Sequence, residues 1–328
     1  MAENSHISWT DHTFNPWIGC TRISPACDGC YAAALMGGEG GRFSRAQWGG
    51  PGKGDGTRER TKDWSKPRKW NRDAAEAPGQ TFVFCASLAD VFDNAVDPAW
   101  RRDLFDLIRA TPNLTWLLLT KRPGMIVKLF RETLPPAYGP NDEEGEWYLP
   151  DMWPRNAAIG CTVVTQEEAD RDVPKLLMAK AALKPAFAFL SMEPLLGDVD
   201  LANIDTMRFA GAERLNALTG ELFGLFGDRA GEIAALDWVI TGGETDQGPH
   251  KARPTHTSQF RALRDQCATA GVAYHHKQNG EWAPRDDEDE PNPVFKVGKA
   301  AAGRLLDGVE HNARPFFPTP ETAGEAET

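Results

Sequence analysis

Apolar segments that alternate with amphipathic helices constrain the fold of this chain more than any other sequence feature. Short apolar runs rich in β-branched and aromatic residues occur at 81–87, 115–120, 156–164, 186–192, 236–241 and 272–277. Amphipathic segments at 98–110, 167–183 and 257–270 follow three of these strands or precede the next one. Apolar strands joined by helical crossovers form parallel sheets with right-handed connections. The pattern therefore predicts an α/β fold built on a parallel sheet.

One further strand is expected ahead of residue 15, which gives six or seven β/α units. That number fits a partial or complete parallel β/α barrel, in a single domain over residues 1–282. A flat, doubly wound sheet is the structural alternative, and the segment pattern does not exclude it.

Three segments stand outside this repeat. The Gly-, Lys- and Arg-rich insertion 37–80 is expected to run over one face of the domain instead of packing as a layer. Residues 198–235 form a second insertion, either a hairpin or a helix pair. In the C-terminal extension 283–328, residues 296–308 are expected to fold back onto the barrel, and the last ten residues have the composition of a disordered end.

A loop at 15–32 contains half of the six cysteines, Cys20, Cys27 and Cys30, spaced C-x6-C-x2-C. Clustered thiolates are reactive and repel one another, so their spacing favours a bound metal group. A structural zinc site normally closes with a fourth Cys or His, and the loop offers none. Three cysteines can instead hold a 4Fe-4S cluster through three irons and leave the fourth iron open. A short helix expected over 28–36 would direct its N-terminal amides at this anionic group.

The sequence around these cysteines carries a family resemblance. Trp9-Thr10-Asp11 and the string NPWIGCTRISPACDGCYA resemble a phage- and prophage-encoded three-cysteine family, a domain of unknown function. That family is similar to divergent radical S-adenosylmethionine (SAM) enzymes and, distantly, to spore photoproduct lyase. The resemblance extends through SLADVF at 87–92, LTKRP at 119–123, SMEPLLG at 191–197, TGGE at 241–244 and GKAAAGRLLDG at 298–308. The spacing departs from the C-x3-C-x2-C usual in radical SAM enzymes.

The resemblance implies a partial barrel of radical SAM type and two cofactors. A 4Fe-4S cluster would be bound by the three loop cysteines, and SAM would bind the open iron. It also implies a flavodoxin- or ferredoxin-like reducing partner. The substrate and the outcome of the reaction are not specified.

Polar residues follow nearly every predicted strand, where parallel β/α folds place their functional groups. We predict cofactor-binding roles for Ser87, Asp90, Lys121, Arg122, Thr165, Gly242 and Gly243, and catalytic roles for Cys85, Glu193 and Glu244. The concentration of polar groups at strand ends is the residue-level argument for an enzyme.

Carboxylates can accept hydrogen bonds from the SAM ammonium group, and basic side chains can donate to its carboxylate. Asp90 or Glu244 fits the first role, and Lys121 or Arg122 fits the second. In radical SAM enzymes a Gly-Gly-Glu tripeptide that holds the SAM amino group usually follows the second strand. Here that tripeptide comes four strands later, so we assign the amino group to Asp90 and leave a substrate role open for Glu244.

Each of these predictions has a structural alternative. Glu193 and Glu244 can be helix caps or can bind loop amides. Cys85 and Cys161 lie within strands and fit as small buried residues. The functional alternative is that one of the two donates a hydrogen atom to a substrate radical, as a cysteine does in spore photoproduct lyase.

Charge is distributed unevenly along the chain. The net charge is −11, which disfavours a protein that coats nucleic acid by charge alone. Residues 42–72 nevertheless carry ten Lys or Arg against three acids, a local balance of +7, interleaved with Trp48, Trp64 and Trp70. Such a segment can contact phosphates and stack on bases. The alternative is a solvated surface loop.

The chain lacks an apolar run long enough to cross a bilayer, and its N-terminus has no signal-peptide pattern. We therefore expect no membrane contact and a reducing, cytoplasmic setting, in which clustered cysteines bind metals more often than they form disulfides. A competing functional interpretation is a zinc-stabilised, non-catalytic module that binds DNA or a partner protein. His6, His12 or Cys85 would then supply the fourth zinc ligand.

Overall fold

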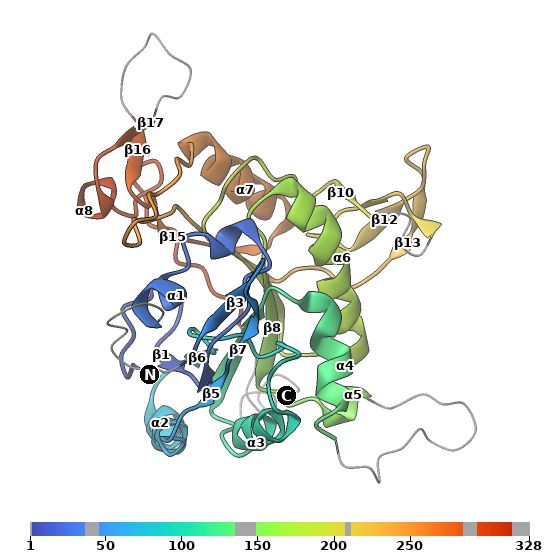
Figure 1. The fold of residues 1–328 in the computed structure, drawn as a ribbon. Helices are drawn as coiled ribbons and strands as arrows, with labels where there is room; N and C mark the ends of the chain where they lie inside the picture. Colours follow the sequence, from blue (N-terminus) through green and yellow to red (C-terminus); the bar gives the residue numbers. More distant parts are fainter. Residues whose placement is uncertain (1, 37–45, 135–148, 207–210, 285–293, 317–328) are drawn as a thin grey trace.

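A parallel sheet forms the centre of the protein in a computed structural model, which describes residues 2–36, 46–134, 149–206, 211–284 and 294–316. Its seven strands are β1 (His12–Phe14), β6 (Thr81–Cys85), β7 (Leu114–Thr120), β8 (Ala157–Thr162), β9 (Ala188–Met192), β14 (Trp238–Gly242) and β15 (Ala273–Gln278). They neighbour one another in chain order, and the sheet curls into a half-barrel (Figure 1). The partial barrel is therefore confirmed. The doubly wound alternative is wrong, because the strand order never reverses.

Helices cover the outer face of this sheet. The described ones that pack there are α2 (Lys66–Glu76), α3 (Pro98–Arg109), α4 (Ile126–Arg131), α5 (Leu149–Met152), α6 (Gln166–Leu183) and α7 (Thr257–Ala270). The start of α3 is set by Asp97, whose side chain accepts a hydrogen bond from the Ala99 amide, followed by Pro98. Gly271, at φ +71°, ends α7. The three long helices lie where the sequence pattern predicts them.

A separate aromatic core fills the concave face of the sheet. It consists of Trp9, Phe82, Phe84, Leu117, Ala158, Phe187, Phe189, Trp238 and Ile240. Alternate residues of each strand point inward, so Phe82 and Phe84 face this core while Val83 and Cys85 face the helices. Gly160 leaves room for the Phe189 ring, since a Cβ there would lie 2.3 Å from it.

The N-terminal segment closes the open side of the half-barrel. Trp9 lies inside, with its ring centroid 4.7 Å from that of Phe84. Ser8 Oγ is 2.8 Å from Nε2 of His275 on β15, the strand at the opposite edge from β1. The first residues thus connect the two edges of the sheet and bring an indole beneath the carboxyl ends of the strands.

The insertion at 37–80 packs more closely than the sequence suggests. Residues 37–45 lie outside the described ranges, but α2 in the second half of the insertion buries Pro67 and Trp70 against the barrel. Two short antiparallel pairings hold the rest. Strand β3 (Trp48–Gly50) forms a hairpin with β4 (Gly54–Gly56), and β5 (Glu59–Arg60) pairs with β2 (Trp17–Ile18) of the cysteine loop. The expectation of a loose excursion is therefore wrong for the α2 part of the insertion.

The insertion at 198–235 contains a four-stranded antiparallel sheet. Its strands are β10 (Ile204–Asp205), β11 (Arg214–Leu215), β12 (Glu221–Phe223) and β13 (Arg229–Glu232). It projects from the barrel on a different side from the hairpin of β16 (Trp282–Pro284) and β17 (Val294–Lys296) (Figure 1). The hairpin alternative for this insertion is therefore correct.

The C-terminal extension folds back as predicted. After α8 (Lys299–Ala302), the chain runs along β15, where the amide of Asn279 donates to Gly303 O at 3.0 Å and that of His276 donates to His311 O at 2.9 Å. The last ten residues, for which disorder was predicted, lie outside the described part. No described helix is long and apolar enough to cross a membrane.

Candidate active site

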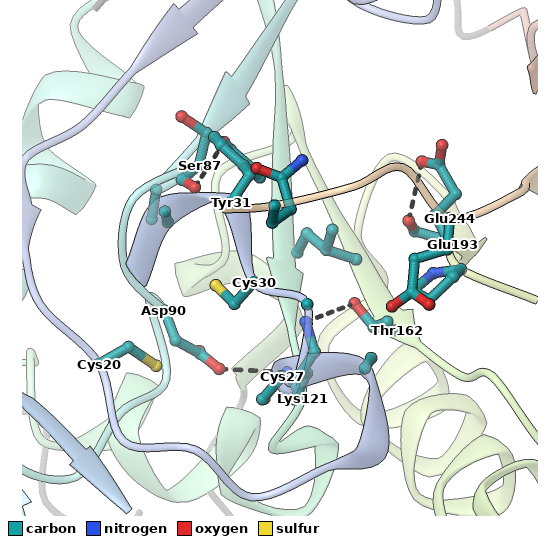
Figure 2. A pocket seen from close by; sticks show the side chains of 18 of the residues that line it. Cys20, Cys27, Cys30, Tyr31, Ser87, Asp90, Lys121, Thr162, Glu193 and Glu244 are labelled. Atoms are coloured by element: carbon teal, nitrogen blue, oxygen red, sulfur yellow. Dashed lines mark hydrogen bonds between the residues drawn. The ribbon is translucent and has the colours of Figure 1, made fainter. Parts of the chain in front are cut away.

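A pocket of about 230 Å³ opens at the carboxyl ends of the strands, directly above the aromatic core. Its lining includes nine residues that the sequence singles out: Cys20, Cys27, Cys30, Ser87, Asp90, Lys121, Glu193, Gly243 and Glu244. Figure 2 shows the cysteines and Asp90 on one side and the two glutamates on the other. The cysteine loop and strand ends far apart in sequence therefore meet around one space.

Short elements with local caps build the cysteine loop. Gly19 precedes the first cysteine at φ +108°, and a Cβ there would lie 2.3 Å from Thr57 O. Ser24 accepts the Ala26 amide at the start of the 3₁₀ turn η1 (Pro25–Cys27). Helix α1 (Tyr31–Met36) begins only after Cys30, three residues later than expected. Its Tyr31 hydroxyl donates to Ser87 O at 2.7 Å, which connects this helix to the end of β6.

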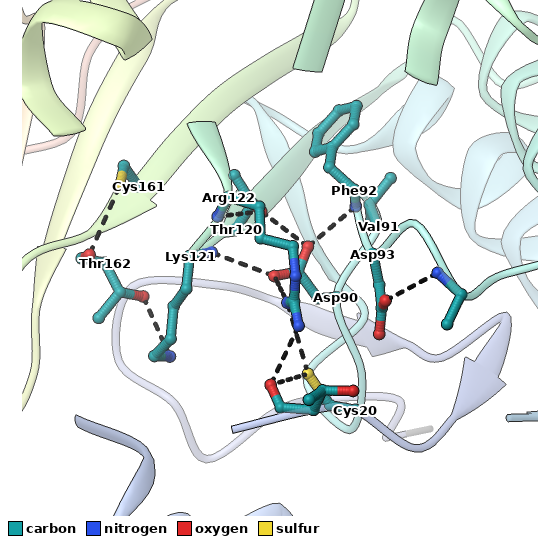
Figure 3. A network of polar contacts seen from close by, with 12 residues as sticks. Cys20, Asp90, Val91, Phe92, Asp93, Thr120, Lys121, Arg122, Cys161 and Thr162 are labelled. Carbon is teal, nitrogen blue, oxygen red and sulfur yellow. Dashed lines mark hydrogen bonds and ion pairs between the residues drawn. The ribbon is translucent and has the colours of Figure 1, made fainter. Parts of the chain in front are cut away.

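An ion pair at the end of β7 clamps the first cysteine (Figure 3). Arg122 Nη1 donates to Asp90 Oδ2 at 2.9 Å and to Cys20 Sγ at 3.7 Å, while Nη2 donates to Thr21 O at 3.0 Å. Burial raises the pKa of Cys20 to about 12. Burial lowers the pKa of Arg122, but Asp90, Cys20 and Asp93 together outweigh it and raise that pKa, so the guanidinium stays charged.

Asp90, the residue assigned to the SAM amino group, has its hydrogen-bonding capacity filled. Oδ1 accepts from Thr120 Oγ1 at 2.7 Å and the Phe92 amide at 2.9 Å, and Oδ2 accepts from Arg122 and the Lys121 amide. The residue is 4% exposed. A carboxylate so saturated holds its neighbours in place, and the geometry corrects the assignment of a ligand ammonium to it.

Glu244 plays the same part on the other side of the loop. It accepts four hydrogen bonds, three of them from the amide and guanidinium of Arg253 at 2.6 to 2.8 Å and one from His250 Nε2 at 3.0 Å. Arg253 continues to Pro25 O at 3.1 Å and to Asp28 at 3.4 Å. Burial alone would raise the pKa of Glu244, but these bonds outweigh it and lower that pKa. Glu244 thus anchors the loop, as its structural alternative proposed.

Two charged residues of the pocket, Lys121 and Glu193, have unused hydrogen-bonding capacity. Lys121 Nζ donates to Thr162 Oγ1 at 3.4 Å, and this ammonium group makes no other hydrogen bond within the described ranges. Burial lowers the pKa of Lys121, yet charge on Cys27, Cys30 and Cys20 outweighs it and raises that pKa. Lys121 lines the same pocket as the three cysteines, and its ammonium group reaches the end of β8 at Thr162.

Glu193 faces the same space from the end of β9. Its Oε2 accepts from Trp9 Nε1 and Ser191 Oγ, both at 3.2 Å. Its Oε1 lies 2.9 Å from Lys277 Nζ but has no partner in hydrogen-bonding geometry among the described residues. Trp9, Thr162 and Lys277 also line the pocket. The first two were missed as site residues, because Trp9 precedes the strand pattern and Thr162 lies within a strand.

Four predicted site residues do not line the pocket. Thr165 caps α6 by accepting from the Glu168 amide at 3.3 Å. Gly242 makes room for Glu193, since a Cβ there would lie 2.7 Å from Oε1. Cys85 points into the helix-covered core, where burial raises its pKa well above the usual range. Arg122 acts through Asp90 and Cys20. A catalytic role for Cys85 does not fit this placement.

The pocket-facing Gly243 serves backbone packing. A Cβ at this position would lie 2.2 Å from Asn279 O, so the glycine permits close approach of the chain after β15. The cofactor-binding role predicted for Gly243 from the sequence stays a prediction.

The donor set can be compared with the two metal groups considered. Across the described residues, no three His, Cys, Asp or Glu side chains are arranged to hold a single metal ion. A zinc ion would gather its ligands within bonds of about 2.3 Å, whereas an iron–sulfur cluster spreads three cysteines over three irons. The proposed fourth zinc ligands lie elsewhere, since His12 stacks on Trp70 and neither His6 nor Cys85 lines the pocket. The three pocket thiols are the residues that could hold a metal group, and Lys121 and Arg122 place positive charge beside them.

Much of the 42–72 segment is engaged within the protein. Arg58 pairs with Asp93, and Arg60 lies over the Trp64 ring and pairs with Asp103. Trp70 is buried and Trp48 lines the pocket. Exposed cations such as Lys53 and Lys62 remain. Nucleic-acid contact through this segment stays a prediction.

Comparison with known proteins places the chain in a family. No curated protein and no solved structure matches it. The profile described as "Protein of unknown function (DUF5131)" matches residues 4–315, which include the cysteine loop, all seven barrel strands and the strand-end residues of the pocket. The chain therefore belongs to the DUF5131 family.

Proposed function

We propose that this protein is a radical SAM-type iron–sulfur enzyme. The observation that carries the proposal is the convergence of Cys20, Cys27 and Cys30 on a strand-end pocket that also presents unused charged groups. A half-barrel with its functional residues at the carboxyl ends of the strands suits an enzyme. Here the cysteine loop is held against those ends by two carboxylate–arginine pairs, each with a buried carboxylate.

The three cysteines would hold a 4Fe-4S cluster, with no fourth protein ligand in the pocket. When bound together with SAM, this group would supply one-electron reduction of the sulfonium, with methionine and a 5′-deoxyadenosyl radical as products and hydrogen abstraction from the substrate as the consequence. The electron would come from a flavodoxin- or ferredoxin-like partner.

The methionyl end of SAM needs a cation for its carboxylate and an anion for its ammonium group. Lys121 and Glu193 are two charged pocket residues whose polar atoms the described part of the protein does not saturate, although Glu193 Oε1 lies 2.9 Å from Lys277 Nζ. Lys121 would donate to the carboxylate and Glu193 Oε1 would accept from the ammonium group. Lys121 is one of the two bases predicted for the carboxylate, and Glu193 takes the place of Asp90 at the ammonium group, because Asp90 and Arg122 hold Cys20.

The apolar floor of the pocket would limit access of water to the reacting groups. Trp9 and Phe84 form this floor, and Trp48 packs near Cys30 at the loop side. A nucleic acid remains one candidate substrate, because exposed Lys53 lies on the hairpin that begins at the pocket residue Trp48.

The decisive experiment is anaerobic iron–sulfur reconstitution followed by electron paramagnetic resonance of the reduced protein, with and without SAM. We expect a cluster signal that shifts on adding SAM, together with release of 5′-deoxyadenosine. Replacing Cys20, Cys27 and Cys30 by alanine should abolish both.

The matched control replaces Cys85, Cys161 and Cys267, the three cysteines outside the pocket, and should retain the signal. A wild-type protein that holds one zinc and no iron after reconstitution would contradict the proposal and favour the binding module.

A further inference from the structure

Cys20 differs from the other two loop cysteines because a guanidinium group contacts its sulfur. Arg122 Nη1 lies 3.7 Å from Cys20 Sγ, within hydrogen-bonding reach of a sulfur acceptor. The Arg122 side chain is 9% exposed, so solvent screens its charge weakly. In Figure 3 the guanidinium lies between the Asp90 carboxylate and the Cys20 sulfur.

Two acceptors besides the sulfur fix the position of this guanidinium, and a further bond holds its backbone. Asp90 Oδ2 accepts from it at 2.9 Å, and Thr21 O accepts from its second nitrogen at 3.0 Å. The Arg122 backbone amide donates to Thr120 Oγ1 at 2.9 Å. Asp90 is itself held by four hydrogen bonds, so the contact with sulfur belongs to a rigid unit at the ends of β6 and β7.

We propose that Arg122 raises the reduction potential of the cluster bound by Cys20, Cys27 and Cys30, an inference that rests on the proposed function. Reduction adds one negative charge to the cluster. A hydrogen bond to a ligating sulfur and a nearby positive charge both stabilise the reduced form. Arg122 supplies both from outside the set of ligands, and it is therefore a positioning and tuning residue.

Arg253 provides a matched comparison, because it contacts the same cysteine loop from the segment after β14. It holds the loop through Pro25 O at 3.1 Å and Asp28 at 3.4 Å, and it pairs with the buried Glu244. Within the described residues, Arg253 makes no hydrogen bond to a cysteine sulfur. Both arginines anchor the loop to a strand end, but only Arg122 reaches a sulfur.

The test measures the midpoint potential of the reconstituted protein by redox titration, with iron and sulfide content determined for every sample. Arg122→Gln should favour the oxidised cluster at least about tenfold, which corresponds to a potential lower by about 59 mV for a one-electron couple. Arg122→Lys keeps the charge without the planar fork and should show a smaller shift. Arg253→Gln should leave the potential at the wild-type value.

The outcomes separate this inference from the proposed function. A full cluster with an unchanged potential in Arg122→Gln would overturn the inference and leave the enzyme assignment intact. An equal shift in Arg253→Gln would also overturn it, because general loosening of the loop would then explain both. If Arg122→Gln fails to hold the cluster, the same comparison is made between Arg122→Lys and Arg253→Lys. Absence of iron from the wild type would overturn both proposals.

Discussion

Two sets of charged residues around the pocket are used in different ways. Asp90 and Glu244 each accept four hydrogen bonds and leave no acceptor free. Glu193 Oε1 and the Lys121 ammonium group keep bonding capacity, although Oε1 lies 2.9 Å from Lys277 Nζ. The first arrangement holds a loop in place, and the second can bind a ligand. Equal charge at a strand end therefore does not mean an equal role.

The largest effect is expected from removing Asp90. Asp90→Ala leaves the Arg122 guanidinium buried without its counter-charge, and it also frees two amides and the Thr120 hydroxyl. Breaking a buried pair of this kind costs about 3–5 kcal/mol of unfolding free energy. Urea unfolding followed by tryptophan fluorescence measures this loss. Asp103→Ala removes an exposed partner of Arg60 and should cost less than about 1 kcal/mol.

Exchanging the two glutamates for glutamine separates binding from anchoring. Glu193→Gln should weaken SAM binding to the reconstituted protein about tenfold, because the ammonium group loses a charged acceptor. Glu244→Gln should instead lower the unfolding free energy, because Arg253 loses its buried partner. Equilibrium dialysis with SAM and urea unfolding on both variants make the comparison. The distinction between a ligand-binding Glu193 and a loop-anchoring Glu244 fails if both variants change the same quantity.

A glycine behind Glu193 tests how far its carboxylate position matters. Gly242→Ala places a Cβ 2.7 Å from Oε1 and must displace the carboxylate. We expect SAM binding to weaken about fivefold, corresponding to about 1 kcal/mol of overpacking. Gly197→Ala is the control, since a Cβ there meets no atom within 4 Å. Unchanged binding in Gly242→Ala would remove Glu193 from the proposed SAM site.

The smallest effect expected is that acid lowers the unfolding free energy by weakening the bonds of Glu244, which anchors the cysteine loop through Arg253. Its pKa is lowered in the folded protein, so its contribution to stability is present above the ordinary value of 4.5 and is lost as pH falls through the folded value. The unfolding free energy of the wild type should therefore decrease more steeply below about pH 4.5 than that of Glu244→Gln. Parallel curves for the two proteins would show that this pair contributes no acid sensitivity.

Part of the fold follows from the sequence because its cause is local. Alternation of apolar strands with helices of period 3.6 determined the parallel sheet, and Asp97-Pro98 and Gly271 determined where α3 begins and α7 ends. The C-x6-C-x2-C spacing likewise brought three thiols into one short loop, independent of any other part of the chain. The burial of α2 was not predictable, because the charged and glycine-rich composition of 37–80 hides a single buried stripe at Pro67 and Trp70.

The roles of individual site residues depended on tertiary structure. Sequence position placed Asp90, Glu193 and Glu244 at strand ends, but it could not tell which carboxylates would be saturated. That depended on Arg253, which folds back onto Glu244 from the loop after β14, and on the packing that brings Trp9 beneath Glu193. The sequence by itself identified the three cysteines and most of the charged strand-end groups that reach the pocket. Only the folded structure decided which of them are consumed by neighbours, because hydrogen-bond partners are set by packing across the sheet.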